Sequence, residues 1–263
     1  MIRSKYFLIL IIVDLFSGCS PKVNNPGEDR KRTSDTVSDK VFPAQVFDLN
    51  NWKLTLPVNT EHNGNPDEIK QPELTTYKDS WFFLNKAKNA VVFRANAGGE
   101  TTSGSNYPRS ELREMTNNGT KSASWSSAVG THTLFIDQRI THLPDVRKHI
   151  VVGQIHDAER YVIFFRLEDK KLLVSVNGGA KITLDPTYVL GTRFTVMFKV
   201  SDNKTQCYYN GALKHTYEGS FEGAYFKAGA YVQSSCKGNK KVEGESCDTY
   251  GEVEVFEAWV KHD

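Results

Sequence analysis

The sequence predicts an all-β fold made of two packed antiparallel sheets. From Val41 onward, apolar and polar residues alternate with a period of two, which is the pattern of strands with one buried face. Turn sequences such as Asn177-Gly178-Gly179 and Asn210-Gly211 separate the alternating segments. Many closely spaced strands without long amphipathic helices between them are typical of a jelly-roll-like sandwich. We expect one of its sheets to be concave.

Eleven segments carry this strand pattern. They are enriched in β-branched and aromatic residues, and turn-forming residues lie between them. In chain order they are Ser80–Leu84, Ala90–Ala95, Ser110–Met115, Thr131–Thr141, His149–His156, Tyr161–Leu167, Lys171–Val176, Arg193–Val200, Thr205–Tyr209, Ala224–Gln233 and Gly251–Lys261. A chain of 263 residues can form one large sandwich, so we expect them to build a single domain.

The N-terminus has the pattern of a bacterial lipoprotein signal. Arg3 and Lys5 supply positive charge, residues 6–13 are apolar, and the Leu-Phe-Ser-Gly sequence of residues 15–18 directly precedes Cys19. We therefore expect cleavage before Cys19 and lipidation of that residue. The alternatives are an ordinary signal peptide cut elsewhere or a membrane anchor, but the apolar stretch is far shorter than the ~20 residues that span a bilayer.

Composition divides the chain into three parts, which we predict to be a signal peptide (1–18), a tether (19–43) and a folded domain (44–263). The tether is polar and contains Pro, Ser, Thr and charges of both signs, so we expect it to be disordered. The prediction is thus an exported protein, either secreted or a lipoprotein of the outer membrane or cell surface. It would be a monomer that contacts the membrane only through its lipid anchor.

The net charge of +2 argues against a nucleic-acid partner. Domains that bind nucleic acid usually carry a stronger basic bias than a pI of about 8.2. An anionic partner would need a local cluster of basic side chains.

Two of the four cysteines are predicted to form a disulfide. Cys236 and Cys247 bracket a polar loop, and a bridge between them in an oxidising compartment would stabilise that loop by about 2–3 kcal/mol. Cys207 lies alone in a predicted strand, where we expect a buried, inert thiol.

Three of the predicted strands carry reactive side chains on one face. Period two places Leu112, Ile155 and Phe226 on the opposite, core-facing side. The polar set, in chain order, is Arg109, Glu111, Arg113, Gln154, His156, Tyr225, Lys227, Tyr231 and Gln233. Any one of these motifs alone is commonly a solvated charge ladder, a structural histidine or a packed tyrosine. Together they predict a cleft for a polyanionic sugar.

These motifs resemble those of the alginate lyases of polysaccharide lyase family 7. The quoted segments are Arg109-Ser110-Glu111-Leu112-Arg113, Gln154-Ile155-His156 and Tyr225-Phe226-Lys227-Ala228-Gly229-Ala230-Tyr231-Val232-Gln233, and residues 47–57 look like the opening of the family's domain. The resemblance covers residues 44–262. Val232 stands where the family commonly has Asn, and period two turns that position toward the core.

The resemblance implies a concanavalin A-like jelly roll that binds alginate on its concave sheet and cleaves it by β-elimination. Arg109 and Gln154 would neutralise the uronate carboxylate before the C5 proton leaves. Tyr231 would protonate the leaving O4 and also act as base for mannuronate, whereas His156 would be the base for guluronate.

The other polar residues would bind substrate. Glu111, Arg113 and Lys227 would position the polymer and hold Arg109, and Tyr225 and Gln233 would complete the groove. No cofactor or metal is expected, since the histidines form no His-Glu-x-x-His array or similar ligand spacing. Ile155 at the centre of the Gln-x-His motif implies a preference for guluronate-containing linkages.

Three other functions are consistent with a sandwich of this kind. One is a lyase for another polyuronate, and a second is a non-catalytic, lectin-like carbohydrate-binding module. A glycoside hydrolase would need two carboxylates flanking the bond, and Glu111 and Glu114 face opposite sides of their strand. Gln154, His156 and Tyr231 together favour the lyase over the binding module.

Overall fold

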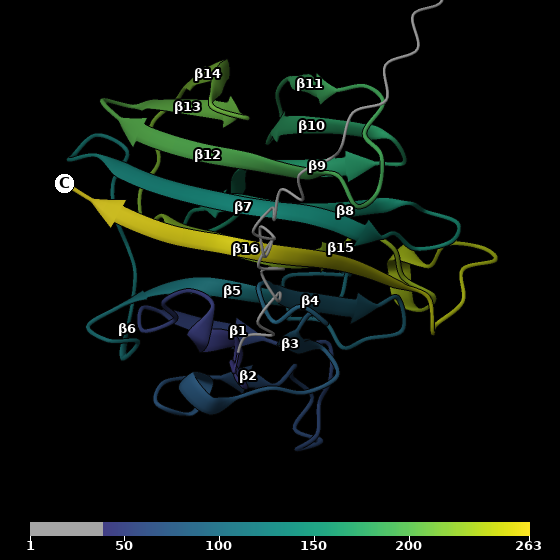
Figure 1. Cartoon of the computed structure of the whole chain (residues 1–263). Coiled ribbons are helices and arrows are strands. Elements are labelled where there is room, and N and C mark those ends of the chain that lie inside the picture. The colour runs from purple at the N-terminus through teal and green to yellow at the C-terminus, as the bar shows by residue number, and fades with distance from the viewer. Residues whose placement is uncertain (1–38) are drawn as a thin grey trace, which may run out of the picture. The chain divides into compact units, whose positions relative to one another are not determined.

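The computed structural model describes residues 39–263, which form two antiparallel sheets with three short 3₁₀ helices (Figure 1). The predicted signal peptide, Cys19 and most of the predicted tether lie outside the described residues. Among residues 39–263, no helix is long and apolar enough to cross a membrane. The predicted all-β fold with two antiparallel sheets is confirmed.

The nine-stranded sheet carries the predicted reactive side chains. Its strands follow the order β11-β10-β9-β8-β15-β5-β1-β2, and β6 pairs with β5. Their bounds are β1 (Trp52–Thr55), β2 (Glu68–Ile69), β5 (Arg109–Thr116), β6 (Lys121–Ser122), β8 (His149–His156), β9 (Tyr161–Glu168), β10 (Lys171–Val176), β11 (Lys181–Asp185) and β15 (Tyr225–Val232).

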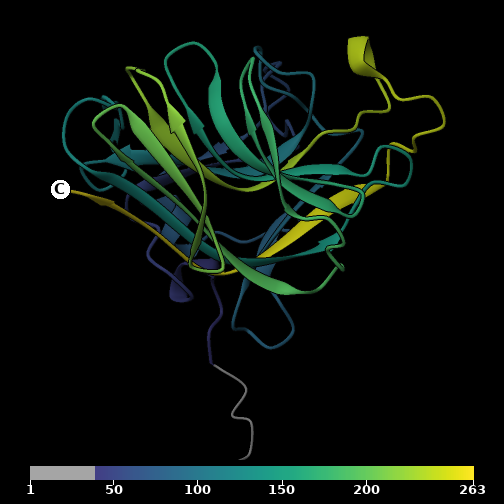
Figure 2. The ribbon, with the colours of Figure 1, turned by 90° about the horizontal axis from the view of Figure 1, so that it is seen from above.

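The seven-stranded sheet packs against the nine-stranded sheet, as the view from above in Figure 2 shows. Its order is β14-β13-β12-β7-β16-β4-β3. The bounds are β3 (Phe82–Leu84), β4 (Val91–Asn96), β7 (His132–His142), β12 (Arg193–Ser201), β13 (Lys204–Tyr209), β14 (Ala212–Glu218) and β16 (Tyr250–His262). The 3₁₀ helices are η1 (Pro43–Gln45), η2 (Glu73–Thr76) and η3 (Gly238–Lys240).

Apolar side chains from both sheets fill the space between them. Phe165 of β9 stacks on Phe198 of β12 with ring centroids 4.3 Å apart. Leu112, Ile155 and Phe226 are fully buried in the same core, as period two predicted. Each large apolar side chain buried in this way contributes roughly 1.5–3 kcal/mol to folding, so the core holds the neighbouring reactive side chains on a rigid support.

Every predicted strand overlaps a strand of the structure, and five further strands occur among the described residues: β1, β2, β6, β11 and β14. β2 and β6 have two residues each, too few to show a period. β14 is largely exposed, so its sequence lacks the alternation that burial of one face imposes.

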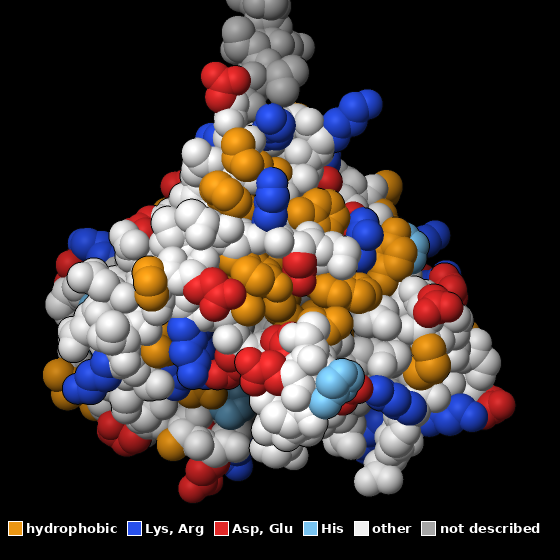
Figure 3. Space-filling model, turned by 90° about the horizontal axis from the view of Figure 1, so that it is seen from below, with side chains coloured by type: hydrophobic (Ala, Val, Ile, Leu, Met, Phe, Trp, Pro, Cys, Tyr) orange, Lys and Arg blue, Asp and Glu red, His pale blue; other side chains and the backbone are white. Residues whose placement is uncertain are grey.

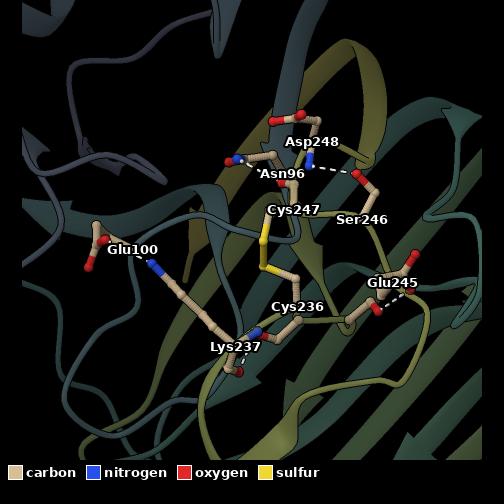
Figure 4. The surroundings of a disulfide bond; sticks show 10 residues. Asn96, Glu100, Cys236, Lys237, Glu245, Ser246, Cys247 and Asp248 are labelled. Atoms are coloured by element: carbon tan, nitrogen blue, oxygen red, sulfur yellow. Dashed lines mark hydrogen bonds and ion pairs between the residues drawn. A yellow bond between two sulfur atoms is a disulfide. The ribbon is translucent and has the colours of Figure 1, made fainter.

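The predicted disulfide between Cys236 and Cys247 is present, with the two Cα atoms 5.1 Å apart (Figure 4). The bridge connects its loop to the start of the segment 97–108: the carbonyl of Cys247 accepts hydrogen bonds from the Gly98 amide and the Asn96 side chain. Cys207 is a buried free thiol whose pKa is raised by burial, which makes it unreactive.

Candidate active site

A pocket of about 600 Å³ opens on the face of the nine-stranded sheet that points away from the core. It is lined by all four residues predicted to be catalytic and by four of the five predicted to bind substrate: Arg109, Arg113, Gln154, His156, Tyr225, Lys227, Tyr231 and Gln233. The fifth, Glu111, is only 1% exposed and contacts three of these side chains from below. The structure therefore brings the whole predicted set together.

Strand register explains this convergence. β15 lies between β5 and β8 and pairs with both. The paired residues are Tyr231 with Arg109, Lys227 with Arg113 and Gln154, and Tyr225 with His156. Because directly opposed residues of antiparallel strands project from the same face, three motifs far apart in the sequence form one surface.

Gly229 permits an irregularity in β15 beside Tyr231. Its φ is +130°, and a Cβ there would lie 2.7 Å from the Ser110 carbonyl oxygen and 2.9 Å from the Phe93 ring. The register with β8 shifts between Ala228 and Tyr231. Glycine is thus required for both conformation and space, which explains its place in the motif.

Glu111 is the centre of the polar network. Its Oε2 pairs with Lys227 Nζ at 2.6 Å and accepts a hydrogen bond from Arg109 Nη1 at 3.1 Å. Its Oε1 accepts a hydrogen bond from Gln154 Nε2 at 2.6 Å. One buried carboxylate therefore fixes three side chains at the base of the pocket.

The network carries more positive than negative charge. Burial would raise the pKa of Glu111, but Lys227 and Arg109 outweigh it and hold this pKa below the ordinary value. Burial and repulsion from Arg109 lower the pKa of Lys227 to about 8, despite its ion pair with Glu111. Near neutral pH, two buried cations thus face one anion, which leaves a positive charge for an anionic ligand.

His156 is positioned to accept a proton. Its Nδ1 lies 2.7 Å from the Asp157 carbonyl oxygen, which can only accept, so Nδ1 carries the hydrogen. Burial is the main cause that lowers the pKa of His156, and Lys227 adds to it. The imidazole is therefore neutral at pH 7, with an unprotonated Nε2. Its ring stacks on Tyr225, with centroids 5.3 Å apart.

Arg113 lines the pocket and packs on Tyr225. Its guanidinium lies 3.9 Å from the centroid of the Tyr225 ring, and Nη1 donates to the Glu114 carbonyl oxygen. It therefore supports the tyrosine that stacks on His156, whereas Glu111 and Tyr231 are the residues that contact Arg109.

Tyr231 contacts the segment 97–108, which carries none of the predicted motifs. Its hydroxyl lies 2.8 Å from Ser105 Oγ, and the Arg109 guanidinium lies 3.9 Å from its ring centroid. Tyr107 packs edge-on against Tyr231 and accepts a hydrogen bond from Arg147 at 2.8 Å. Ser105 and Tyr107 line the pocket and Arg147 contacts Tyr107, yet none of the three belongs to a motif, so only the fold brings them together.

A larger pocket of about 1000 Å³ adjoins this one and has a different electrostatic character. The two share Thr55, Glu68, Thr102 and Ser103. Five acidic residues line the larger pocket: Glu61, Asp67, Glu68, Glu73 and Asp79. Figure 3 shows acidic side chains beside an apolar area on the face that contains β1–β3. A polyanion is attracted to the smaller, cationic pocket and repelled from the larger one.

Comparison with known proteins identifies the family. The family model for alginate lyase matches residues 47–262. The chain belongs to the alginate lyases of polysaccharide lyase family 7. This family match includes every residue of the pocket described above, and the predicted jelly roll is the fold of its solved members.

Solved alginate lyases cover most of the chain. The family 7 alginate lyase AlgAT5 is 52% identical, with a TM-score of 0.80 over 85% of this chain and 100% of its own. An alginate lyase from Corynebacterium sp. is 42% identical, with a TM-score of 0.79 over 85% of this chain and 99% of its own. The family 7 lyase A1-II′ is 26% identical, with a TM-score of 0.71, covering 84% of this chain and 97% of its own. It was solved in complex with substrate (GGMG) as a variant with one His and one Tyr replaced.

A curated alginate lyase from Klebsiella pneumoniae matches a shorter part of the chain. It is 38% identical over 79 residues, which is 29% of this chain and 26% of the relative's length.

Proposed function

We propose that the protein is an alginate lyase that depolymerises alginate by β-elimination in the pocket around Glu111. The observation that carries this proposal is the network in which one buried carboxylate holds Arg109, Lys227 and Gln154 beside His156 and Tyr231. Such a site combines surplus positive charge with two groups that transfer protons. Family membership supports alginate as the substrate.

The first step is neutralisation of the uronate carboxylate. Gln154 donates one amide hydrogen to Glu111 and keeps the second for the substrate. Arg109 likewise uses one Nη1 contact for Glu111, and its remaining donors are available to an anion in the pocket. Hydrogen bonds from both residues strengthen as negative charge develops on the carboxylate during removal of the C5 proton.

Proton removal and departure of the leaving group follow. The C5–H and C4–O4 bonds break, a C4=C5 double bond forms, and the proton taken from the acid joins O4. In guluronate the C5 hydrogen and O4 lie on opposite faces, so His156 Nε2 takes the proton and Tyr231 donates its own. In mannuronate they lie on the same side, and Tyr231 serves as base and then as acid.

We further propose a preference for guluronate-containing linkages. Ile155 is fully buried between Gln154, which would bind the uronate carboxylate, and His156, which would accept the proton. It therefore acts through the backbone position of Gln154 and His156, and not by contact with the sugar. The family resemblance of the Gln-Ile-His sequence supports this preference.

The test is incubation of the protein with polymannuronate, polyguluronate and alternating alginate in separate reactions. Elimination gives an unsaturated sugar with strong ultraviolet absorbance, and we expect the fastest rise on polyguluronate. Cleavage of another polyuronate with no cleavage of alginate would show instead that the protein is a lyase for that other polymer. Binding of alginate without any cleavage would favour a lectin-like module.

We also propose that the domain acts outside the cytoplasm as a lipid-anchored monomer. The Leu-Phe-Ser-Gly-Cys sequence at residues 15–19 supports lipidation of Cys19. Replacement of Cys19 by Ala should move the protein from the membrane fraction to the soluble fraction and leave its catalytic rate unchanged. Unchanged fractionation would contradict the anchor.

A further inference from the structure

The Ser105 hydroxyl is the centre of three hydrogen bonds beside the active site. It lies 2.8 Å from the Tyr231 hydroxyl and 3.1 Å from the Tyr107 carbonyl oxygen, and it accepts a hydrogen bond from the Tyr107 amide at 3.1 Å. A serine has a single hydrogen and two lone pairs. The arrangement therefore restricts which atom donates to which.

The hydroxyl hydrogens of Ser105 and Tyr231 are arranged differently in the protonated and deprotonated forms of Tyr231. While Tyr231 is protonated and no substrate is bound, all three hydrogen bonds form together only if the Tyr231 hydroxyl donates to Ser105 and Ser105 donates to the Tyr107 carbonyl. When Tyr231 gives its proton to a leaving oxygen, its own oxygen can only accept. The Tyr231 O–H must turn from Ser105 to the leaving oxygen before the transfer, and rotation of the Ser105 hydroxyl away from the Tyr107 carbonyl then supplies a hydrogen bond to the phenolate.

The loop that carries Ser105 is held at several points. Glu100 pairs with Lys237 of the disulfide loop at 3.0 Å, as Figure 4 shows. The Pro108 carbonyl accepts a hydrogen bond from the Val232 amide. Together with the bond from Arg147 to the Tyr107 hydroxyl, these contacts fix the Ser105 hydroxyl relative to the strand that carries Tyr231.

We propose that Ser105 is a positioning residue for Tyr231, holding the phenol in place and exchanging its hydrogen-bond direction when the phenol loses its proton. This inference rests on the proposed function, in which Tyr231 transfers protons for both uronates. The Arg109 guanidinium over the same ring stabilises the phenolate as well. Ser105 acts through Tyr231 and needs no contact with the sugar.

The kinetic test compares Ser105→Ala with Ser105→Thr. A hydrogen bond to a charged group is strong enough that its loss should lower kcat roughly ten- to hundredfold. KM should change little, and the same loss should appear on polyguluronate and polymannuronate. Ser105→Thr retains a hydroxyl and should recover most of the rate. Thr101→Ala, which removes a hydroxyl from the same loop at a residue that does not line the pocket, is the matched control and should behave like the wild type.

A measurement without substrate separates this inference from the proposed function. The NMR signal of the Tyr231 ring is assigned by its absence in Tyr231→Phe. It should shift in Ser105→Ala and stay near its wild-type position in Ser105→Thr and Thr101→Ala. An unchanged ring signal in Ser105→Ala, or a kcat of this variant equal to that of the wild type, would overturn the inference even if the wild type cleaves alginate. A wild type inactive on all alginates would instead refute the proposed function, and the ring signal would still decide the role of Ser105.

Discussion

Gln154 Nε2 donates a hydrogen bond to Glu111 Oε1 at 2.6 Å, and both side chains are at most 2% exposed. An ionised carboxylate can only accept hydrogen bonds, so this contact fixes which end of the Gln154 amide faces Glu111. The second amide hydrogen is then directed elsewhere in the pocket. Glu111 thus orients the neutral amide of Gln154 as well as the cations Arg109 and Lys227.

Glu111→Gln should therefore disable the site. The variant loses the charge that balances Arg109 and Lys227, and its amide can no longer accept from three donors. We expect kcat/KM to fall at least about 100-fold and unfolding free energy to fall by about 3–5 kcal/mol, as when a buried pair is broken. Initial rates and thermal unfolding measure both effects. Glu159→Gln, which alters an exposed carboxylate at the pocket rim, is the control and should retain activity. Near wild-type activity of Glu111→Gln would contradict the role of the network.

The pH dependence of binding should reflect Lys227. Its pKa is lowered to about 8, so the free enzyme loses this positive charge as the pH rises through that value. We expect kcat/KM, which reports groups of the free enzyme, to fall above about pH 8. A bound carboxylate favours the charged lysine, so the fall in kcat should come at higher pH. Lys227→Met should lack the alkaline decrease, and the same decrease in that variant would assign it to another group.

The two proposed bases differ in which linkages they serve. Tyr231→Phe should abolish cleavage of every block type, whereas His156→Ala should reduce guluronate cleavage more than mannuronate cleavage, by roughly 10²–10⁴-fold for a general acid–base group. Because burial lowers the pKa of His156, guluronate cleavage should persist below pH 6.5 and decline only at more acidic pH. Rates on the two homopolymers measure the difference. Equal losses in His156→Ala would limit this residue to positioning.

The disulfide should support activity as well as stability. The bridge anchors Gly98, and Lys237 of its loop pairs with Glu100, so both hold the segment that contacts Tyr231. Replacing Cys236 and Cys247 by Ser should lower the unfolding free energy by about 2–3 kcal/mol and reduce kcat at temperatures where the protein stays folded. Cys207→Ala, which removes the buried free thiol, should leave kcat unchanged. A double Ser variant with full kcat would show that the bridge serves stability alone.

The sequence was sufficient to predict the fold class and the set of residues that meet at the pocket. Period two alone separates Arg109 and Glu111 from Leu112, because one face of β5 packs on the core. The disulfide followed from two cysteines around a polar loop. These features depend on local pattern, which a single sequence displays directly.

Other features depend on contacts between distant segments and could not be predicted in this way. Ser105 reaches Tyr231 across 126 positions of sequence, and Arg147 reaches Tyr107 across 40. Arg113 was expected to position the polymer and to help hold Arg109; it lines the pocket, and its guanidinium lies over the ring of Tyr225, a contact that the sequence pattern did not indicate. Such contacts are set by loop path and side-chain packing, and no periodicity marks them.

The mass of the products tests the proposed reaction most directly. Elimination adds no water, so the two fragments of a defined guluronate oligosaccharide should together weigh the same as the intact substrate. The fragment from the reducing side of the cut carries the new unsaturated end and should be lighter by one water than a saturated oligosaccharide of the same length. Mass spectrometry of a digest by the wild type, with Tyr231→Phe as the inactive reference, should show this pair. Fragments whose masses sum to the substrate plus one water would show hydrolysis and contradict the proposed function.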